Sequence, residues 1–362
     1  MRQTRMPFDM STMNFASDNW AGASDRVAAA LVGAAGGHAP AYGNDPLSEG
    51  VTEALSRIFE RRVAVFFVGT GTAANALSLA HVARPGGVVF CHRHAHIAND
   101  EAGAPEFLSG GSRLHSIEGT GARVTADGLA EAIALYPPHA VFHGQPAAVS
   151  ISQLTEAGTA YSAAEIAALA DVAHEAGLPL HMDGARFANA LVGLGARPAD
   201  ITWRAGVDML SFGGTKNGCF AAEAVIFFDP EKARGFEFQR KRAGHLFSKS
   251  RFVSAQFSAY LEDDHWLDLA RHANATARRL ADGIEQSPGA HLALQPDGNE
   301  VFAILPRAVD ARLKAAGAVY YEWHAGNLAG EAVAPDELLV RLVTSFRTTD
   351  VEVDRFVGLL TQ

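Results

Sequence analysis

Two charged residues stand at the ends of apolar segments in the middle of the sequence. Asp183 follows the run 180–182, and Lys216 comes shortly after the run 207–212. Such runs are typical of buried strands, and in an open α/β sheet ligands bind beyond the carboxyl ends of the strands. A Lys and a carboxylate there suit pyridoxal 5′-phosphate, which needs an amine for a Schiff base and an anion beside its pyridine nitrogen. The residues alone leave a second interpretation open, in which Lys216 binds a phosphate in a loop and Asp183 caps a helix.

A glycine-rich turn upstream could hold a phosphate. Gly69-Thr70-Gly71-Thr72 lies between a β-rich segment, 62–68, and a segment with helical spacing, 73–83. A strand, a tight turn and a helix N-terminus together present free backbone N–H groups and a favourable dipole to an anion. The turn is not a P-loop, because no Lys-Ser/Thr pair follows at the required spacing.

The elements that must position these residues alternate between strands and helices. This alternation predicts an α/β fold with a large, mostly parallel twisted sheet and helices on both of its faces. The expected strands are 62–68, 87–91, 113–117, 140–142, 179–182, 207–212 and 223–228, and the expected helices include 25–35, 46–59, 73–83, 125–134 and 162–176.

The last third of the chain predicts a second, smaller lobe. The segment 234–261 is basic and aromatic with few strand signals, and 265–284 has the spacing of a long helix. Strands are expected at 299–305, 318–323 and 337–344, which indicates a small α+β domain. We therefore expect a flexible leader at 1–13, a large cofactor-binding domain at 14–255 and a small C-terminal domain at 256–362.

Composition excludes several classes of protein. The 30 Lys and Arg against 40 Asp and Glu give a net charge of −10, which argues against binding nucleic acid. No run of 18 apolar residues and no apolar leader segment is present, so we expect a cytoplasmic protein that does not enter membranes. Cys91 and Cys219 cannot form a disulfide framework and are expected to be small interior side chains. The histidines of His92-Arg93-His94-Ala95-His96 lack further ligands at matching spacing, so no metal site is predicted.

An ordered set of short segments spanning residues 17–344 resembles the L-threonine aldolases. This family belongs to the fold-type-I pyridoxal phosphate enzymes, whose fold is that of aspartate aminotransferase. The segments are Ser17-Asp18-Asn19, Ala41-Tyr42-Gly43-Asn44-Asp45-Pro46, Gly71-Thr72-Ala73-Ala74-Asn75, Ala95-His96 with Glu101, His181-Met182-Asp183-Gly184-Ala185-Arg186, Thr215-Lys216 and Arg341-Leu342-Val343-Thr344.

The resemblance implies a role for each residue around the cofactor ring. Lys216 would form the Schiff base, and Asp183 would keep the pyridine nitrogen protonated. Arg186 would lie near the ring hydroxyl O3′ and lower the pKa of the Schiff base. His96 would stack on the ring, a choice over His94 that rests on the family spacing to Glu101.

The resemblance also implies that two subunits build each site. Gly71 and Thr72 would bind the cofactor phosphate from one subunit. A basic loop of the neighbouring subunit, with Arg251 and Lys249, would reach the same phosphate, and Tyr42 would approach across the interface. A homodimer or homotetramer with shared active sites is therefore expected.

On the substrate side, Arg341 would bind the α-carboxylate of an amino acid, with Ser17 as a further donor. Thr155 stands where many relatives carry a substrate-binding His, so the base for the substrate hydroxyl could be His96, a water or Glu156. The expected reaction is retro-aldol cleavage of L-3-hydroxy-α-amino acids, giving glycine and acetaldehyde from L-threonine or L-allo-threonine, or benzaldehyde from phenylserine. The alternatives are a β-eliminating lyase, another amino-acid enzyme of this fold, and an inactive binding protein.

Overall fold

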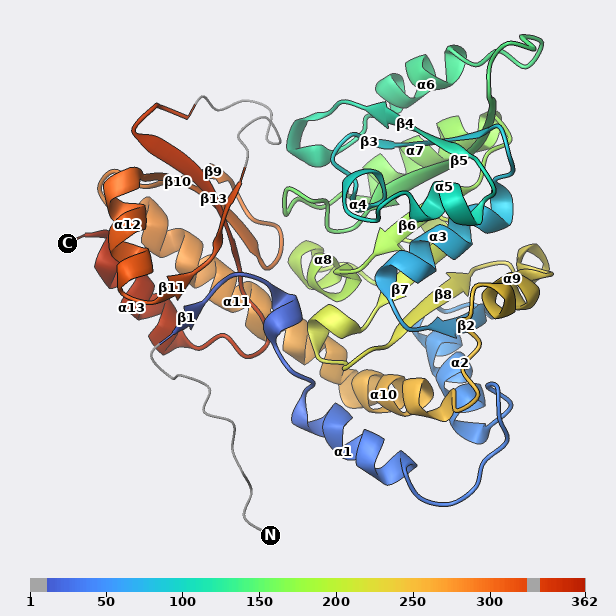
Figure 1. The fold of residues 1–362 in the computed structure, drawn as a ribbon, viewed down its shortest axis with the longest axis horizontal. Helices are drawn as coiled ribbons and strands as arrows, with labels where there is room; N and C mark the ends of the chain where they lie inside the picture. Colours follow the sequence, from blue (N-terminus) through green and yellow to red (C-terminus); the bar gives the residue numbers. More distant parts are fainter. Residues whose placement is uncertain (1–11, 324–332, 362) are drawn as a thin grey trace.

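The computed structural model describes residues 12–323 and 333–361, which form a large lobe and a small lobe side by side (Figure 1). The large lobe is built on a sheet of seven strands, β2 (Ala64–Val68), β3 (Gly87–His92), β4 (Arg113–Ile117), β5 (Gln145–Ser152), β6 (Leu180–Gly184), β7 (Met209–Gly213) and β8 (Glu223–Phe227). Their order is β2-β8-β7-β6-β5-β3-β4. Neighbours from β4 to β7 are parallel, whereas β8 is antiparallel to both β7 and β2.

Both faces of this sheet are covered, so its strands are apolar throughout. Val88 and Phe90 of β3 join the core on the face of α2, α7, α8 and α10, whereas Val89 and Cys91 join a core beneath α3. The helices of the large lobe are α1 (Asp25–Ala34), α2 (Pro46–Ile58), α3 (Gly71–Val82), α4 (His96–Asn99), α5 (Ala104–Leu108), α6 (Ala126–Ala134), α7 (Ala163–Glu175), α8 (Phe187–Leu194), α9 (Phe236–Arg242) and α10 (Arg251–Leu261).

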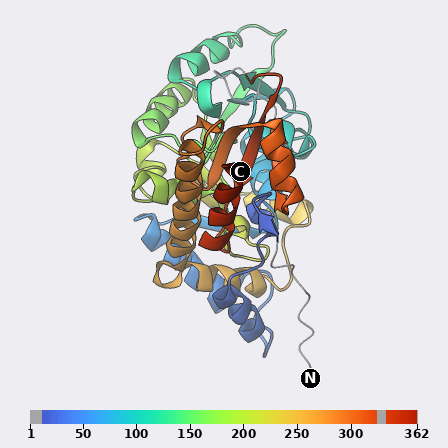
Figure 2. The same ribbon diagram turned by 90° about the vertical axis from the view of Figure 1, so that its left-hand side faces the viewer.

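The small lobe packs helices against an antiparallel sheet. Its four strands are β9 (His291–Leu294), β10 (Glu300–Pro306), β12 (Tyr321–Trp323) and β13 (Glu337–Val343), in the order β12-β13-β10-β9. Its helices are α11 (His265–Glu285), α12 (Arg307–Ala315) and α13 (Asp350–Leu360), which face the viewer in Figure 2. The long helix α11 joins the lobes, because it packs against α8 as well as α13.

The start of the described chain belongs structurally to the small lobe. β1 (Met13–Asn14) pairs in parallel with β11 (Ala318–Val319), and Met13 and Phe15 are buried in the core of that lobe. The predicted leader lies outside the described residues except for its last two positions, of which Met13 is buried. The predicted domain boundary at 255/256 falls inside α10, which packs on α1 and α2 of the large lobe.

Most expected elements are present, but one predicted strand is wrong. Residues 140–142 form a turn in which Val141 and Phe142 are 85% and 95% exposed, and the strand begins later, with β5 at Gln145. The predicted strand 318–323 is divided into β11 and β12. The basic segment 234–261, for which the sequence predicts no helix or strand, contains the helices α9 and α10.

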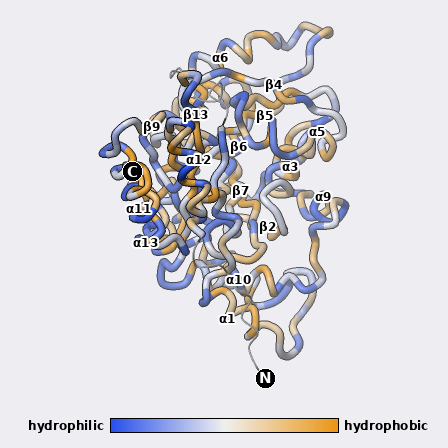
Figure 3. Tube along the Cα trace, turned by 60° about the vertical axis from the view of Figure 1, so that its left-hand side comes forward, coloured by the Kyte–Doolittle hydropathy of each residue, from blue (hydrophilic) through white to orange (hydrophobic). Residues whose placement is uncertain are grey.

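Polar and apolar residues are interspersed along the whole described chain. The trace in Figure 3 alternates between polar and apolar colouring instead of showing one long apolar stretch. Among the described helices, none is both long and apolar enough to cross a lipid bilayer.

Candidate active site

A cavity of about 270 Å³ lies at the carboxyl ends of the parallel strands of the large lobe. A larger groove, of about 1300 Å³, lies at the amino ends of the parallel strands and includes none of the predicted site residues. The smaller cavity is therefore the candidate active site. It is lined by Asn19, Gly69, Thr70, Gly71, Thr72, Asn75, His96, Glu101, Leu154, Glu156, Asp183, Ala185, Arg186, Thr215, Lys216 and Glu223.

One wall of the cavity is the turn between β2 and α3. The side chain of Thr70 caps α3 by accepting a hydrogen bond from the N–H of Ala73 at 3.1 Å. The N–H groups of Gly71 and Thr72, in the first turn, have no acceptor within the helix. A Cβ at Gly69 would lie 2.9 Å from Cζ of Phe247, so a side chain there would require the Phe247 ring to move. The turn therefore offers backbone donors to an anion, as the sequence predicts.

Asp183 and Lys216 line the same cavity, at the ends of two neighbouring strands. Asp183 is the fourth residue of β6, and Lys216 lies in the short 3-10 helix Thr215–Asn217 that follows β7. Gly213 at the end of β7 allows the two turns to pack closely, since a Cβ there would meet the carbonyl oxygen of Ala185 at 2.6 Å. Asp183 is buried, and Lys216 is partly exposed to the cavity.

Asp183 is held in a chain of short hydrogen bonds that we call the carboxamide array: His96, Glu101, Asn75 and Asp183. Nδ2 of Asn75 donates to Oδ2 of Asp183 and to Oε1 of Glu101, both at 2.8 Å. Nδ1 of His96 lies 2.9 Å from the same Glu101 oxygen. Oδ1 of Asp183 accepts from the N–H of Ala185 at 3.0 Å. The array fixes the anion on β6 and the imidazole on α4 relative to each other.

The charges in the array shift two pKa values. The hydrogen bond to Glu101 raises the pKa of His96, although partial burial opposes the shift. Burial raises the pKa of Glu101, and the hydrogen bonds from His96 and Asn75 only partly offset it. Both shifts act in the same direction, toward holding a proton on this pair of side chains.

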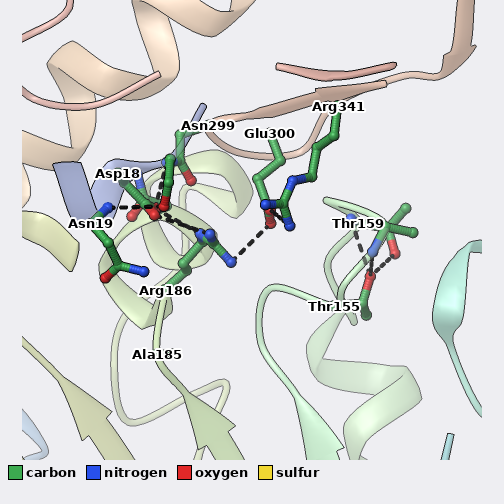
Figure 4. A network of polar contacts seen from close by, with 12 residues as sticks. Asp18, Asn19, Thr155, Thr159, Ala185, Arg186, Asn299, Glu300 and Arg341 are labelled. Carbon is green, nitrogen blue, oxygen red and sulfur yellow. Dashed lines mark hydrogen bonds and ion pairs between the residues drawn. The ribbon is translucent and has the colours of Figure 1, made fainter. Parts of the chain in front are cut away.

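Where the two lobes meet, a second cluster consists of Asp18, Arg186, Glu300 and Arg341, which we call the lobe junction (Figure 4). Nε and Nη2 of Arg186 donate to the two carboxylate oxygens of Asp18 at 2.7 and 3.1 Å. Nη1 of Arg186 lies 3.2 Å from Oε2 of Glu300, and Nη1 of Arg341 lies 3.9 Å from Oε1 of the same residue. The guanidinium of Arg341 also stacks over the ring of Trp323 at 4.5 Å.

The pKa values of the two carboxylates of the lobe junction are shifted in opposite directions. Burial would raise the pKa of Asp18, but the charges of Arg186 and Lys216 outweigh it and hold that pKa below its usual value. Burial raises the pKa of Glu300 despite Arg186 and Arg341, and neither oxygen of its carboxylate has a hydrogen-bond partner within the described structure. The tight partner of Arg186 is therefore Asp18.

The cavity brings together six of the predicted site residues, namely Gly71, Thr72, His96, Asp183, Arg186 and Lys216. The other predicted residues do not line it. Ser17 caps the 3-10 helix Asp18–Trp20 through the N–H of Asn19 at 3.1 Å. The hydroxyl of Thr155 is buried and bonds to the carbonyl of Gly121 and the hydroxyl of Thr159, so only its neighbours Leu154 and Glu156 reach the cavity.

Arg341 does not line the cavity, but Glu300 connects it to Arg186, which does. The residues that the resemblance assigns to a second subunit lie on the surface of this chain. Tyr42 is half exposed, and its ring lies 5.4 Å from Nζ of Lys241. Nη1 of Arg251 donates to the carbonyl of Gly37 at 3.4 Å, and Lys249 is exposed.

Sequence reasoning gave no role to Asn75, Glu223, Glu300 or Asp18. Asn75 and Asp18 stand inside motifs that were quoted for the resemblance, but their partners lie far away in the sequence. Glu223 and Glu300 share a usable signal, because each is a charged residue at the head of an otherwise apolar strand. A buried charge of this kind needs a partner or a function.

The chain belongs to the β-eliminating lyase family, whose sequence model matches residues 14–307. It is 41% identical over 310 residues to the low specificity L-threonine aldolase of Pseudomonas aeruginosa, covering 86% of this chain and 89% of the relative. A protein of the same name from a Pseudomonas species is 41% identical over 291 residues, covering 80% and 84%. The solved structure of Leishmania major threonine aldolase matches with a TM-score of 0.88 at 26% identity, covering 96% of this chain and 98% of that one.

These similarities confirm the predicted fold class, a fold-type-I pyridoxal phosphate enzyme. The residues of the cavity fit that cofactor. Asp183 is an acceptor held by two donors, Lys216 lines the same cavity, and so does the turn whose backbone N–H groups lie at the start of α3. The pyridine nitrogen, the aldehyde and the phosphate of pyridoxal phosphate thus each have a group of suitable chemistry in one cavity.

Proposed function

We propose that this chain is a pyridoxal 5′-phosphate-dependent L-threonine aldolase, a carbon–carbon lyase that cleaves L-3-hydroxy-α-amino acids into glycine and an aldehyde. The observation that carries the proposal is the single cavity that holds Lys216, Asp183 and the phosphate turn, in a chain closely similar to two low specificity L-threonine aldolases. L-Threonine and L-allo-threonine, which yield acetaldehyde, are the proposed substrates, and phenylserine is a further candidate.

The bound cofactor would supply a cationic ring that withdraws the electron pair of the broken Cα–Cβ bond. Lys216 would hold the cofactor covalently through its amine. Asp183 would keep a proton on the ring nitrogen, and the carboxamide array would fix the carboxylate for that contact. His96 would lie against the ring, and Gly71 and Thr72 would bind the phosphate. Arg186 would contribute positive charge beside the ring.

A base must take the proton of the substrate hydroxyl. The hydroxyl of Thr155 is engaged with Gly121 and Thr159, which argues against a direct role. Of the remaining candidates, His96 and Glu156 line the cavity, and a water could also serve. We propose His96, because it lines the cavity and Glu101 holds its Nδ1, which leaves Nε2 as the ring nitrogen that would take the proton.

We propose Arg341 and Ser17 as the binding site for the substrate carboxylate. Support for Arg341 comes from its place in the lobe junction and from its Nε, which is buried without a hydrogen-bond partner among the described residues. Its distance of 3.9 Å from Glu300 leaves the guanidinium able to form a bidentate contact with a carboxylate.

We further propose that the active form is a homodimer or homotetramer. In this arrangement Arg251 and Lys249 of one subunit would approach the phosphate site of another, and Tyr42 would lie at the interface. The proposal rests on the family resemblance and on the exposure of Tyr42 and Lys249 in the single chain. A cytoplasmic location stays a prediction.

The proposed function is tested by trapping the cofactor and by an aldehyde assay. The purified protein should absorb as a lysine-bound pyridoxal enzyme, and borohydride followed by peptide mapping should find the cofactor on Lys216. Lys216→Ala should lose this absorbance band and nearly all turnover, because Lys216 is the one lysine among the described residues that line the cavity. L-Threonine, L-allo-threonine and L-phenylserine should each yield an aldehyde and glycine.

Three outcomes would contradict the proposal. Cofactor trapped on another lysine would exclude Lys216 as its attachment site. A keto acid with ammonia in place of an aldehyde would identify a β-eliminating lyase. A protein that neither binds the cofactor nor acts on these substrates would be a binding protein on the same fold.

A further inference from the structure

Glu223 is a buried carboxylate in the cavity to which the proposed reaction gives no role. It is the first residue of β8, and in the sheet it stands opposite Val68 of β2 and Gly213 of β7. Its Oε1 accepts a hydrogen bond from the N–H of Thr215 at 3.3 Å. Within the described structure it forms no ion pair with any Lys, Arg or His. An isolated buried carboxylate is costly and calls for an explanation.

The position of Glu223 in the sheet places it at the phosphate end of the cavity. Val68, its partner on β2, directly precedes the turn of Gly69 to Thr72, and that turn and Glu223 line the same space. The groups proposed to bind the phosphate and this carboxylate thus line the same cavity from neighbouring strands. A carboxylate and a phosphate dianion in one cavity would repel each other.

Burial is the largest influence on the pKa of Glu223 and raises it to about 7. Hydrogen bonds from the side chain and the N–H of Thr215 and the charge of Lys216 lower this pKa, and Asp183 raises it further. Cys219 and Tyr260 stay neutral because burial raises the pKa of each. His245, which lies 3.4 Å from the N–H of Gly69, has its pKa lowered by burial. Arg240 contacts the carbonyl of Phe67 at 3.4 Å, on the strand beside Glu223.

We propose that Glu223 takes up a proton when a phosphate ester enters the cavity and then serves, as a neutral carboxylic acid, as a hydrogen-bond donor at the phosphate end. The proton comes from solvent, and no covalent bond changes. The identity of the phosphate ester rests on the proposed function. A buried carboxylic acid kept neutral so that it can donate is an established device in enzyme sites. Cofactor affinity should therefore be linked to pH through Glu223.

The test uses pyridoxine 5′-phosphate, which has no carbonyl group and cannot react with Lys216. Binding to the cofactor-free protein is measured by titration calorimetry at pH 8 in two buffers of different ionisation enthalpy. At that pH the phosphate is already a dianion, because its second pKa is about 6. We expect the uptake of close to one proton. Between pH 8 and 9 the affinity should fall by up to about tenfold, as linkage to one titrating group requires.

Two comparisons separate Glu223 from other sources of protons. Pyridoxine without the phosphate should bind without proton uptake, since nothing then repels the carboxylate. Glu223→Gln keeps the shape and the acceptor for the N–H of Thr215, and it should bind the phosphate ester with little proton uptake and an affinity nearly independent of pH. Glu300→Gln is the matched control, because it changes another buried carboxylate of raised pKa but should retain the uptake.

The outcomes that overturn the proposal are distinct from those that overturn the function. Wild-type protein that binds pyridoxine 5′-phosphate without taking up a proton refutes the role of Glu223, whatever the variants do. Unchanged uptake in Glu223→Gln also refutes it. A wild-type protein that does not bind the phosphate ester at all refutes the phosphate site itself, and with it the proposed cofactor.

Discussion

The carboxamide array and the lobe junction are both buried polar clusters beside the cavity, but they are built differently. The array lies entirely within the large lobe, and its contacts are 2.8–2.9 Å long. The lobe junction spans both lobes. Arg186 of the large lobe is bound tightly to Asp18, at 2.7 and 3.1 Å, whereas it lies 3.2 Å from Glu300 of the small lobe, and Glu300 lies 3.9 Å from Arg341. The array is uniformly short and contained in a single lobe, and the lobe junction becomes looser toward the small lobe.

This difference indicates a division of labour. Short hydrogen bonds on adjacent secondary-structure elements suit a group that must keep one orientation, as Asp183 must beside a cofactor ring. Longer contacts with unpartnered atoms, such as Nε of Arg341 and the oxygens of Glu300, leave capacity for a further ligand. Breaking the array should therefore cost mainly catalysis, whereas removing Arg186 from the lobe junction should cost stability as well.

The largest catalytic effect that tests the array is expected at His96. His96→Phe keeps a surface for stacking but removes the proposed base, so cleavage of L-threonine should fall by on the order of 10²–10⁴-fold with cofactor still bound. Thr155→Ala should cost much less. The measurement is kcat/KM for both variants, with cofactor occupancy checked by absorbance. If the Thr155 variant is the more impaired, the base is a water near Thr155 and His96 only stacks.

Asp183→Asn sharpens the comparison within the array. The amide keeps the size of the side chain but not its charge, so the protein should retain the cofactor while kcat falls by about 10²–10³-fold, the loss typical of one preorganised electrostatic partner. Asp208→Asn is the control. Asp208 is paired with Lys232 and His174 near the larger groove, and its variant should keep kcat. A near-normal kcat in Asp183→Asn would mean that the carboxylate has another task.

Arg186→Ala should cost stability in addition to activity. Removing the guanidinium leaves Asp18 and Glu300 buried without their common cation, which should lower the free energy of unfolding by about 3–5 kcal/mol. Urea denaturation of the cofactor-free protein measures this change. Arg204→Ala removes an exposed arginine that pairs with Glu60 and Asp200, and its effect should be much smaller. Equal losses in the two variants would show that the lobe junction does not stabilise the fold.

The smallest expected effect concerns Glu223 and the pH dependence of stability. Its pKa is about 7 in the folded protein against 4.5 in the unfolded chain, so the folded state binds the proton more tightly. The resulting stabilisation is fully present below pH 4.5 and is lost as the pH rises through 7. Relative to wild type, cofactor-free Glu223→Gln should gain a few kcal/mol of stability between these values. Parallel stability curves for the two proteins would show that the carboxylate is not protonated in the fold.

The sequence predicted the sheet and the two charged strand ends because those features depend on local pattern. Continuous apolar runs mark strands buried on both faces, and their carboxyl ends meet at one edge. The same reasoning failed at 140–142, where a short apolar run is exposed in a turn. Apolar character alone does not say whether a segment is buried, and three residues are too few to show a period.

The partners within the site could not be read from local pattern. Asn75 contacts Asp183, and Arg186 contacts Asp18 and Glu300, across separations in sequence that carry no periodic signal. Such contacts depend on how the strands are ordered and how the lobes meet. The burial of Glu223 and Glu300 likewise follows from the sheet order. The signal that could have found them is a charged residue at the start of an otherwise apolar strand.

The pairing of β1 with β11 has a consequence for how the protein is made. During translation Met13 and Asn14 leave the ribosome first, and their partners Ala318 and Val319 follow about 300 residues later. At typical rates of synthesis that delay is on the order of 15–60 s. The large lobe can assemble in the meantime, whereas the small lobe must wait for both ends of the chain. Trimming the polypeptide just before Phe15, or fusing a bulky partner there, would therefore disturb a lobe whose other strands lie some 300 residues further along the chain.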